Sequence, residues 1–264
     1  ISGRRTTLVA FLLVGTDVND AYNNTPGGAS GTILGVDSVG QFRVLVSGYG
    51  AEFGRTGGGI IDEITRSGTS KLHGSAFEFA RNSAMDAKNY FDSPTAPIPA
   101  FSRNQFGGSL GGPISKRDFY FGNYEGLRQS LGVTTSALVP NATARASSVA
   151  SVQPFLSIIP TPNNTVFTDG TGYFRTTNTN RTTEDFFVTR YDHQQSDRTS
   201  YFARFQFDNA NAYTPDSLQI SQAHNRSRTQ YLTGQMTHSF SDHLVNQARV
   251  AYNRSYYTLE YTVI

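Results

Sequence analysis

The residues of this chain that come nearest to a chemical motif are three consecutive glycines, Gly57 to Gly59. A glycine-rich turn binds phosphate when a helix N-terminus follows it and Lys-Ser or Lys-Thr closes the motif. Here the glycines lead into Ile60, Ile61 and Ile64, which predict a short strand, and no such closing pair follows. The pattern therefore predicts a tight turn or close backbone packing rather than phosphate binding.

The other side chains that could bind a metal ion or act on a substrate lack the spacing such sites need. The five histidines are scattered and cysteine is absent, which excludes a thiolate zinc site and a disulfide framework. Asp17, Asn19 and Asp20 begin like a calcium loop, but its glycine and closing glutamate are missing. No Gly-x-Ser-x-Gly motif occurs. We expect no metal, no cofactor and no enzyme activity.

Two arginines, Arg55 and Arg66, flank the short apolar strand. If this strand lies inside a barrel, each guanidinium needs a carboxylate partner on the barrel wall. Glu78 and Glu125, which fall within predicted strands further along the chain, are the available candidates. The alternative is that both arginines are exposed surface residues.

Composition narrows the class of protein. The 264 residues carry a net charge of only +2, which does not suggest a nucleic-acid partner. Phe (19), Tyr (14) and Gly (25) are plentiful. The longest apolar run, Leu8 to Val14, is far short of the roughly 18 residues of a membrane helix. This excludes a helical membrane protein but leaves a β-barrel open. The chain opens without Met and ends within a predicted strand, so we expect a fragment.

Alternating polar and apolar residues bounded by turn residues predict antiparallel strands through the larger, later part of the chain. The predicted strands are residues 71–82, 104–114, 119–130, 184–196, 199–208, 227–240 and 244–258. The connections between them alternate in length. Tight turns are predicted at Ser115–Asp118, Ser196–Arg198 and Ser241–His243, and longer loops at 83–103, 131–183 and 209–226. Short turns on one rim and long loops on the other are typical of an outer-membrane barrel, whereas loops of about 50 residues are unusual in a compact soluble domain.

The predicted strands have two unlike faces. In 199–208 one face carries Tyr201, Ala203, Phe205 and Phe207, and the other carries Phe202, Arg204 and Gln206. One apolar and one hydrophilic face suit lipid outside and a wet lumen inside. They equally suit a soluble sheet with one solvated face. The alternation of short turns and long loops is what favours the barrel.

Several segments, in order along the chain, resemble the plug-to-barrel junction of TonB-dependent outer-membrane receptors, and in particular the Oar-like subgroup. The matching segments are Phe42–Val46, Tyr49–Arg55, Gly57–Ile61, Thr65–Thr69, His73–Ser75, Arg81–Asp92, Arg103–Pro113 and Phe119–Gln129. Val14 departs from the family, which usually has Asp there, and Asp62 and Glu63 place two charges in a plug strand that is usually less charged.

The resemblance implies an all-β fold, namely part of a barrel of about 22 transmembrane strands that follows part of a plug domain. Residues 1–69 would be the C-terminal part of the plug and residues 70–264 the first strands of the barrel. It also implies a bacterial outer-membrane location, contact with outer-membrane lipid, and energised uptake driven by the TonB complex through an N-terminal box outside this chain. The long loops would contact an extracellular substrate that the sequence does not identify.

Two alternatives follow from the same residues. The first is an Oar-like outer-membrane protein with an adhesive or structural role. The second is a secreted, soluble β-sandwich adhesin. A TonB box upstream and substrate-dependent uptake would distinguish the transporter from the first, and a detergent requirement would exclude the second.

Overall fold

A computed structural model gives the structure of the chain. It describes residues 5, 8–19, 27–31, 34–50, 53–54, 57–88 and 97–264. The helices among these residues are too short to span a membrane. The described residues form two β-sheets, one of seven strands and one of four.

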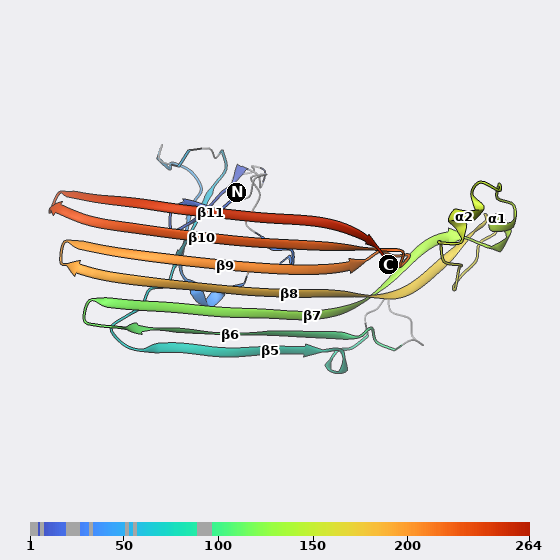
Figure 1. Ribbon diagram of the computed structural model, residues 1–264, viewed down its shortest axis with the longest axis horizontal. Coiled ribbons are helices and arrows are strands. Elements are labelled where there is room, and N and C mark those ends of the chain that lie inside the picture. Colours follow the sequence, from blue (N-terminus) through green and yellow to red (C-terminus); the bar gives the residue numbers. More distant parts are fainter. Residues whose placement is uncertain are drawn as a thin grey trace.

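The larger sheet is a continuous antiparallel meander in which every strand pairs with its neighbours in the sequence (Figure 1). Its strands are β5 (His73–Asn82), β6 (Phe101–Pro113), β7 (Asp118–Pro140), β8 (Thr171–Ser196), β9 (Thr199–Pro215), β10 (Ser221–Ser241) and β11 (Leu244–Val263). The predicted number of strands, their order and the all-β class are confirmed. The connections β6–β7, β8–β9 and β10–β11 are the tight turns that the sequence predicts, and all three lie at one end of the sheet.

The strands are longer than predicted at the other end, and the predicted extents of two loops are wrong. The sequence assigns 131–183 to a loop, but β7 continues to Pro140 and β8 begins at Thr171, with unbroken pairing from Pro140↔Thr171 inward. Likewise most of 209–226 belongs to β9 and β10. These outer segments are rich in Thr, Ser and Asn on both faces, so they lack the apolar alternation that marks a half-buried strand. Cross-strand pairing extends them instead.

The remaining β7–β8 connection folds into a small cap at the outer end of the sheet (Figure 1). It contains two short helices, α1 (Ala142–Ala146) and α2 (Gln153–Leu156). The side chain of Asn141 begins α1 by accepting a hydrogen bond from the Ala144 N–H at 3.1 Å. Arg145 then donates to four backbone carbonyls, those of Pro140, Leu156, Ile159 and Pro160. One guanidinium thus holds both ends of the cap together.

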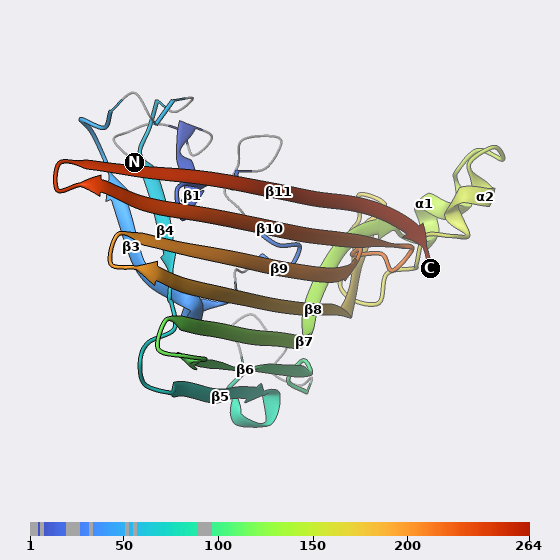
Figure 2. The ribbon, with the colours of Figure 1, turned by 60° about the vertical axis from the view of Figure 1, so that its left-hand side comes forward.

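The smaller sheet has the strand order β2-β1-β4-β3 and comes from the first part of the chain. Its strands are β1 (Ala10–Leu13), β2 (Thr16–Asp17), β3 (Val39–Leu45) and β4 (Ile60–Thr65), with β1 and β4 parallel. Figure 2 shows β3 and β4 running across the direction of the barrel strands rather than along it. A 3₁₀ turn, η2 (Val36–Ser38), leads into β3, and η3 (Ser83–Met85) follows β5.

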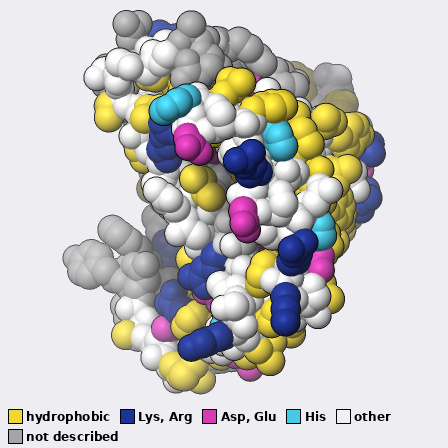
Figure 3. Space-filling view, turned by 90° about the vertical axis from the view of Figure 1, so that its left-hand side faces the viewer, with side chains coloured by type: hydrophobic (Ala, Val, Ile, Leu, Met, Phe, Trp, Pro, Cys, Tyr) yellow, Lys and Arg dark blue, Asp and Glu magenta, His cyan; other side chains and the backbone are white. Residues whose placement is uncertain are grey.

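The two faces of the larger sheet differ as the sequence predicts. On the face turned toward the small sheet, Arg204, Asp208 and Ala210 are buried. On the opposite face, large apolar and aromatic side chains are exposed; they include Tyr124, Tyr191, Tyr201, Leu232, Val250 and Tyr252. Seen from the end that carries the short turns, hydrophobic side chains gather along the right-hand side of the molecule (Figure 3). This face is the one suited to lipid.

Candidate functional site

The candidate site is the contact between the small sheet and the inner face of the large one, and part of it is apolar. Leu34 joins Phe121, Leu127, Phe186 and Val188 of the large sheet in one buried cluster. A second cluster holds Leu13, Val18 and Tyr231, with Phe11 packed against it. Both clusters combine residues from the first 40 positions with residues from the barrel strands, so the two sheets share their core.

Glu125 is the buried carboxylate at the centre of one polar contact. It is 2% exposed, and its Oε2 accepts a hydrogen bond of 2.7 Å from the backbone N–H of Gly35. Its Oε1 accepts from the side-chain amide of Gln105 at 2.5 Å. Gly35 has φ 93°, and a Cβ there would lie 2.3 Å from the ring of Phe186. The contact therefore requires glycine both for backbone conformation and for space.

Further hydrogen bonds join the sheets at several separate points. The N–H of Ala29 donates to the Ser227 hydroxyl at 2.7 Å, and the Asn253 amide donates to the carbonyl of Asp17 at 2.5 Å. Near β5, the Ser75 hydroxyl donates to Asp37 at 2.8 Å. Each bond uses a side chain that faces inward from a barrel strand. The small sheet is therefore held by spaced polar contacts as well as by its apolar clusters.

Two arginines, one half-buried and one buried, face the small sheet from β8 and β9. Arg190 pairs with Asp192 at 2.7 Å and also donates to the carbonyl and hydroxyl of Thr65, each at 3.4 Å. Arg204 is 1% exposed, and among the described residues its Nε and Nη2 have no hydrogen-bond partner. Glu63, on β4, interacts electrostatically with Arg204. Burial raises the pKa of Glu63, whereas Arg204 lowers it and Asp62 raises it further.

A pair of buried carboxyl groups lies further along the same wall. Glu184 is fully buried and Asp208 is 9% exposed, and their side chains are hydrogen-bonded to each other. A Cβ added at Gly28 would lie 3.4 Å from Oε1 of Glu184, so the chain between β2 and β3 passes close to this pair.

The structure describes three of the four residues predicted to join the plug to the barrel. Arg55 lies outside the described residues. Arg66 donates from Nε to the carbonyl of Val39 at 3.1 Å, within the small sheet, and no pair with Glu78 or Glu125 is present among the described residues. Glu78 is exposed. Glu125 does meet the small sheet, but through the backbone of Gly35 rather than through an arginine. Arg66 is satisfied locally because a neighbouring strand offers a carbonyl within reach.

The sequence did not predict that three further charged residues, Arg190, Arg204 and Glu63, meet at this contact. The sequence did indicate the direction of the Arg204 side chain, because the alternation of polar and apolar residues placed it on the hydrophilic face of its strand. Nothing in the sequence indicated that this face is buried. No group of three or more metal-ligating side chains occurs in the part of the chain that the structure describes.

Comparison with known proteins gives the family. The model of the family described as "Outer membrane beta barrel domain" matches residues 64–155 and 148–263. Over 126 residues the chain is 31% identical to the TonB-dependent transporter Oar of Myxococcus xanthus, a match that covers 46% of this chain and 12% of that protein. The fold is similar to that of the outer membrane transporter YddB from Escherichia coli, with a TM-score of 0.62 at 13% identity.

This last match covers 96% of the chain and 32% of the solved structure. The chain thus spans about an eighth of the curated relative and about a third of the solved one. At this level of identity the structural match shows the fold alone. The chain belongs to the outer membrane beta barrel domain family and is a protein of the bacterial outer membrane.

Proposed function

We propose that this chain is part of a TonB-dependent transporter that takes up a substrate across the outer membrane with energy supplied through the TonB complex. In this proposal residues 1–69 are the C-terminal part of a plug, and residues 70–264 are the first strands of the barrel that the plug occludes. The similarity to Oar of Myxococcus xanthus supports this class of protein. The proposal makes the protein a carrier rather than an enzyme.

The observation that carries the proposal is the polar character of the contact between the two sheets. A plug domain that stayed fixed in the barrel would be held best by close apolar packing, because burying charged groups costs free energy. Here the contact includes Arg204, Glu125 and the Glu184–Asp208 pair, and two nitrogens of Arg204 lack partners among the described residues. Such groups gain hydrogen bonds when water enters. A plug seated on them is released at lower cost than one seated on an apolar wall.

A disulfide across the contact tests the proposal, because the sequence contains no cysteine of its own. Ala29, in the connection between β2 and β3, and Ser227 are joined by a 2.7 Å hydrogen bond, so the A29C/S227C variant should fix this connection, and with it the small sheet, to β10. The matched control is M236C/A248C, whose residues are cross-strand partners on the outward face of β10 and β11, away from the small sheet. The control bridges two barrel strands and leaves the small sheet free.

Uptake is measured as the depletion of a mixture of glycans, peptides and metal chelates by cells that express the full-length protein, with and without TonB. TonB-dependent depletion should disappear in oxidised A29C/S227C, return on reduction, and persist in the control. If no component is depleted in a TonB-dependent manner, or if the cross-linked protein transports normally, the proposal fails.

One observation favours the alternative of an adhesive or structural outer-membrane protein. Strands β7 and β8 extend beyond their neighbours and present a compact cap, fixed by Arg145, at the outer end of the sheet (Figure 1). A rigid projection of this kind suits contact with a surface. Deletion of residues 141–170 should abolish adhesion under this alternative while leaving TonB-dependent uptake intact.

A further inference from the structure

The outward, lipid-facing side of the sheet carries arginines at one level, on β10 and β11. Arg226, Arg228 and Arg254 line a cavity of about 370 Å³ together with Asn209, Gln230 and Tyr256. We call these six residues the arginine shelf. They share a face because Arg228 is paired with both Asn209 and Tyr256, and Gln230 is paired with Arg254. Charged side chains on the outside of a barrel are costly at mid-membrane depth, so the position of the shelf along the strands matters.

The shelf begins where the apolar part of the outer face ends. Leu232 lies two residues from Gln230 along β10, on the side of the short turns. Its partners on the neighbouring strands are Phe205 and Tyr252, and all three side chains face outward. Gln230 lies about 10 residues from the turn end of β10, which is the length of one transmembrane strand. The shelf therefore lies at the outer boundary of the hydrocarbon layer, at the level of the outer-leaflet headgroups.

The positive charge of the shelf is not neutralised within the described residues. Arg228 donates to Asn209 at 3.0 Å and lies 5.8 Å from the ring centre of Phe207, which leaves its charge unpaired. No ion pair involves Arg226 or Arg254 among the residues with a described position. Glu260 on β11 shares this face, two residues beyond the partner of Arg226, but it forms no ion pair with the shelf among the described residues. Asp185, two strands away from Arg228, is bound by Arg128 at 2.7 Å.

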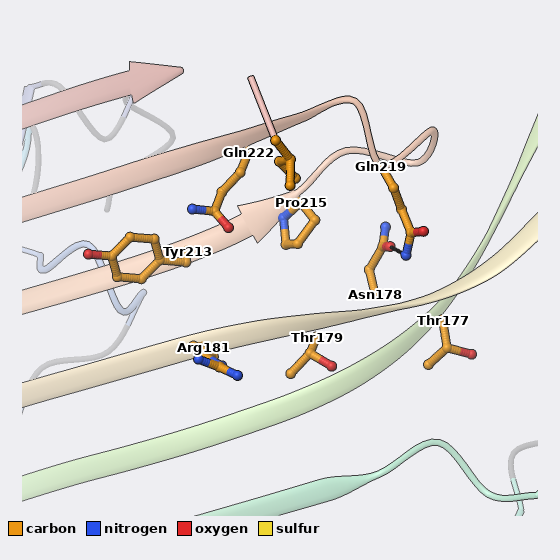
Figure 4. Close-up of a pocket in the computed structure, with 9 residues that line it drawn as sticks. Thr177, Asn178, Thr179, Arg181, Tyr213, Pro215, Gln219 and Gln222 are labelled. Atoms are coloured by element: carbon orange, nitrogen blue, oxygen red, sulfur yellow. Dashed lines mark hydrogen bonds between the residues drawn. The ribbon is translucent and has the colours of Figure 1, made fainter. Parts of the chain in front are cut away.

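Farther out on the same face lies a second cavity, of about 780 Å³, with a different lining (Figure 4). Hydroxyl, amide and aromatic groups and one guanidinium surround it; the residues include Thr177, Thr179, Arg181, Tyr213, Gln219 and Gln222. The amide of Gln219 donates to Asn178 at 2.9 Å, and Asn178 donates to the carbonyl of Asp216 at 2.7 Å, which fixes the rim. A tyrosine ring among amides and hydroxyls presents an apolar face and hydrogen-bonding groups, as sugar rings require.

We propose that this outward face binds a phosphorylated glycolipid of the outer leaflet. Its acyl chains lie on the apolar residues around Leu232, its phosphates on the arginine shelf, and its sugars in the outer cavity. The order of the three surfaces along the strands, apolar then cationic then polar, matches the order of chemical groups along such a lipid. Guanidinium groups bind phosphate through paired, charge-assisted hydrogen bonds. The proposal rests on the outer-membrane location and not on transport.

The test removes two shelf charges without disturbing the sheet. R226Q/R254Q replaces two of the three shelf arginines and keeps Arg228, which is hydrogen-bonded to Asn209 and packs on Phe207. The matched control, K116Q/R198Q, removes two exposed positive charges from the short turns at the opposite rim. The full-length protein in detergent is titrated with bisphosphorylated lipopolysaccharide, with the same lipid after removal of its phosphates, and with inorganic phosphate as competitor. Binding is followed by native mass spectrometry.

We expect R226Q/R254Q to bind the phosphorylated lipid at least about tenfold more weakly, since it loses two charge-assisted contacts. The control should bind like the parent, and the dephosphorylated lipid should not distinguish the proteins. Unchanged binding by R226Q/R254Q, or an equal loss in the control, overturns the proposal. Complete displacement of the lipid by millimolar inorganic phosphate also overturns it, because the site would then be a simple anion site.

A second variant tests the sugar part separately. Gln222 lines the outer cavity, and Q222A should weaken binding of lipopolysaccharide that carries its core sugars by about threefold, the effect of one lost hydrogen bond. The same variant should bind the sugar-free lipid A like the parent protein. Equal affinities of Q222A and the parent for the sugar-bearing lipid would overturn the assignment of the outer cavity to sugars.

Discussion

Gly35 and Glu125 are 90 residues apart in the sequence, yet the N–H of the first donates to the buried carboxylate of the second at 2.7 Å. This bond joins the small sheet to the wall of the large one. It depends on a backbone conformation that glycine adopts readily and on a carboxylate that Gln105 holds in place. The first two predictions concern the two partners of this bond.

Replacement of Glu125 by Gln should loosen the small sheet. Both carboxylate oxygens accept hydrogen bonds, and an amide can accept only one of them, which leaves a buried donor facing a donor. We expect a loss of about 1–3 kcal/mol in the free energy that holds the segment. Hydrogen exchange of residues 34–45 in the full-length protein measures this. E78Q is the control, because Glu78 is exposed. Equal exchange in both variants would contradict the prediction.

Replacement of Gly35 by Ala should have a larger effect than the same change at Gly31. Both glycines have positive φ, 93° and 73°, so both variants carry backbone strain. Only at position 35 does the new Cβ meet a neighbour, 2.3 Å from the ring of Phe186, whereas nothing lies within 4 Å at position 31. We expect an excess loss of about 1–3 kcal/mol for G35A, typical of overpacking. Thermal unfolding of the two variants provides the comparison, and similar midpoints would refute it.

The attachment of the small sheet should weaken as the pH rises. Burial is the largest cause that raises the pKa of Glu63 above its ordinary value of 4.5, while Arg204 opposes the shift. A carboxyl group with a raised pKa in the folded state contributes stability that is complete below its unfolded pKa. That stability is lost as the pH increases through the folded value. Exchange at β4 should therefore increase between about pH 4.5 and the raised value, and E63Q should remove this dependence. A flat profile in the parent protein would show that Glu63 is not responsible.

The outer cap should depend on Arg145. This side chain donates to four carbonyls that close the β7–β8 connection, and Lys cannot reproduce the planar set of donors. R145K should make residues 141–170 sensitive to proteinase K while the barrel strands stay resistant. R175K is the matched control, since Arg175 is exposed and its side chain makes none of these bonds. Equal cleavage of the two variants would exclude this role.

Local patterns predicted most of the large sheet. In the halves of the strands next to the short turns, polar and apolar residues alternate because one face meets lipid and the other meets the barrel interior. The short turns at Ser115–Asp118 and Ser241–His243 are marked by polar turn residues. The halves of the strands that lie away from the short turns were not predicted, because both of their faces are polar. Backbone pairing between β7 and β8 decides their length, and no local pattern reports it.

The sequence by itself determined the class of fold, the order of the strands, the two faces of the sheet and the family resemblance. These properties follow from residue type and spacing along one segment at a time. Only the tertiary structure decided which charged groups meet. Arg66 finds a carbonyl on its own sheet, whereas Glu125 is reached by the N–H of Gly35, and Arg204 is buried beneath the small sheet. The physical reason is that a charged side chain binds a hydrogen-bonding group that lies close to it in space. The packing of one sheet on the other decides which groups lie close.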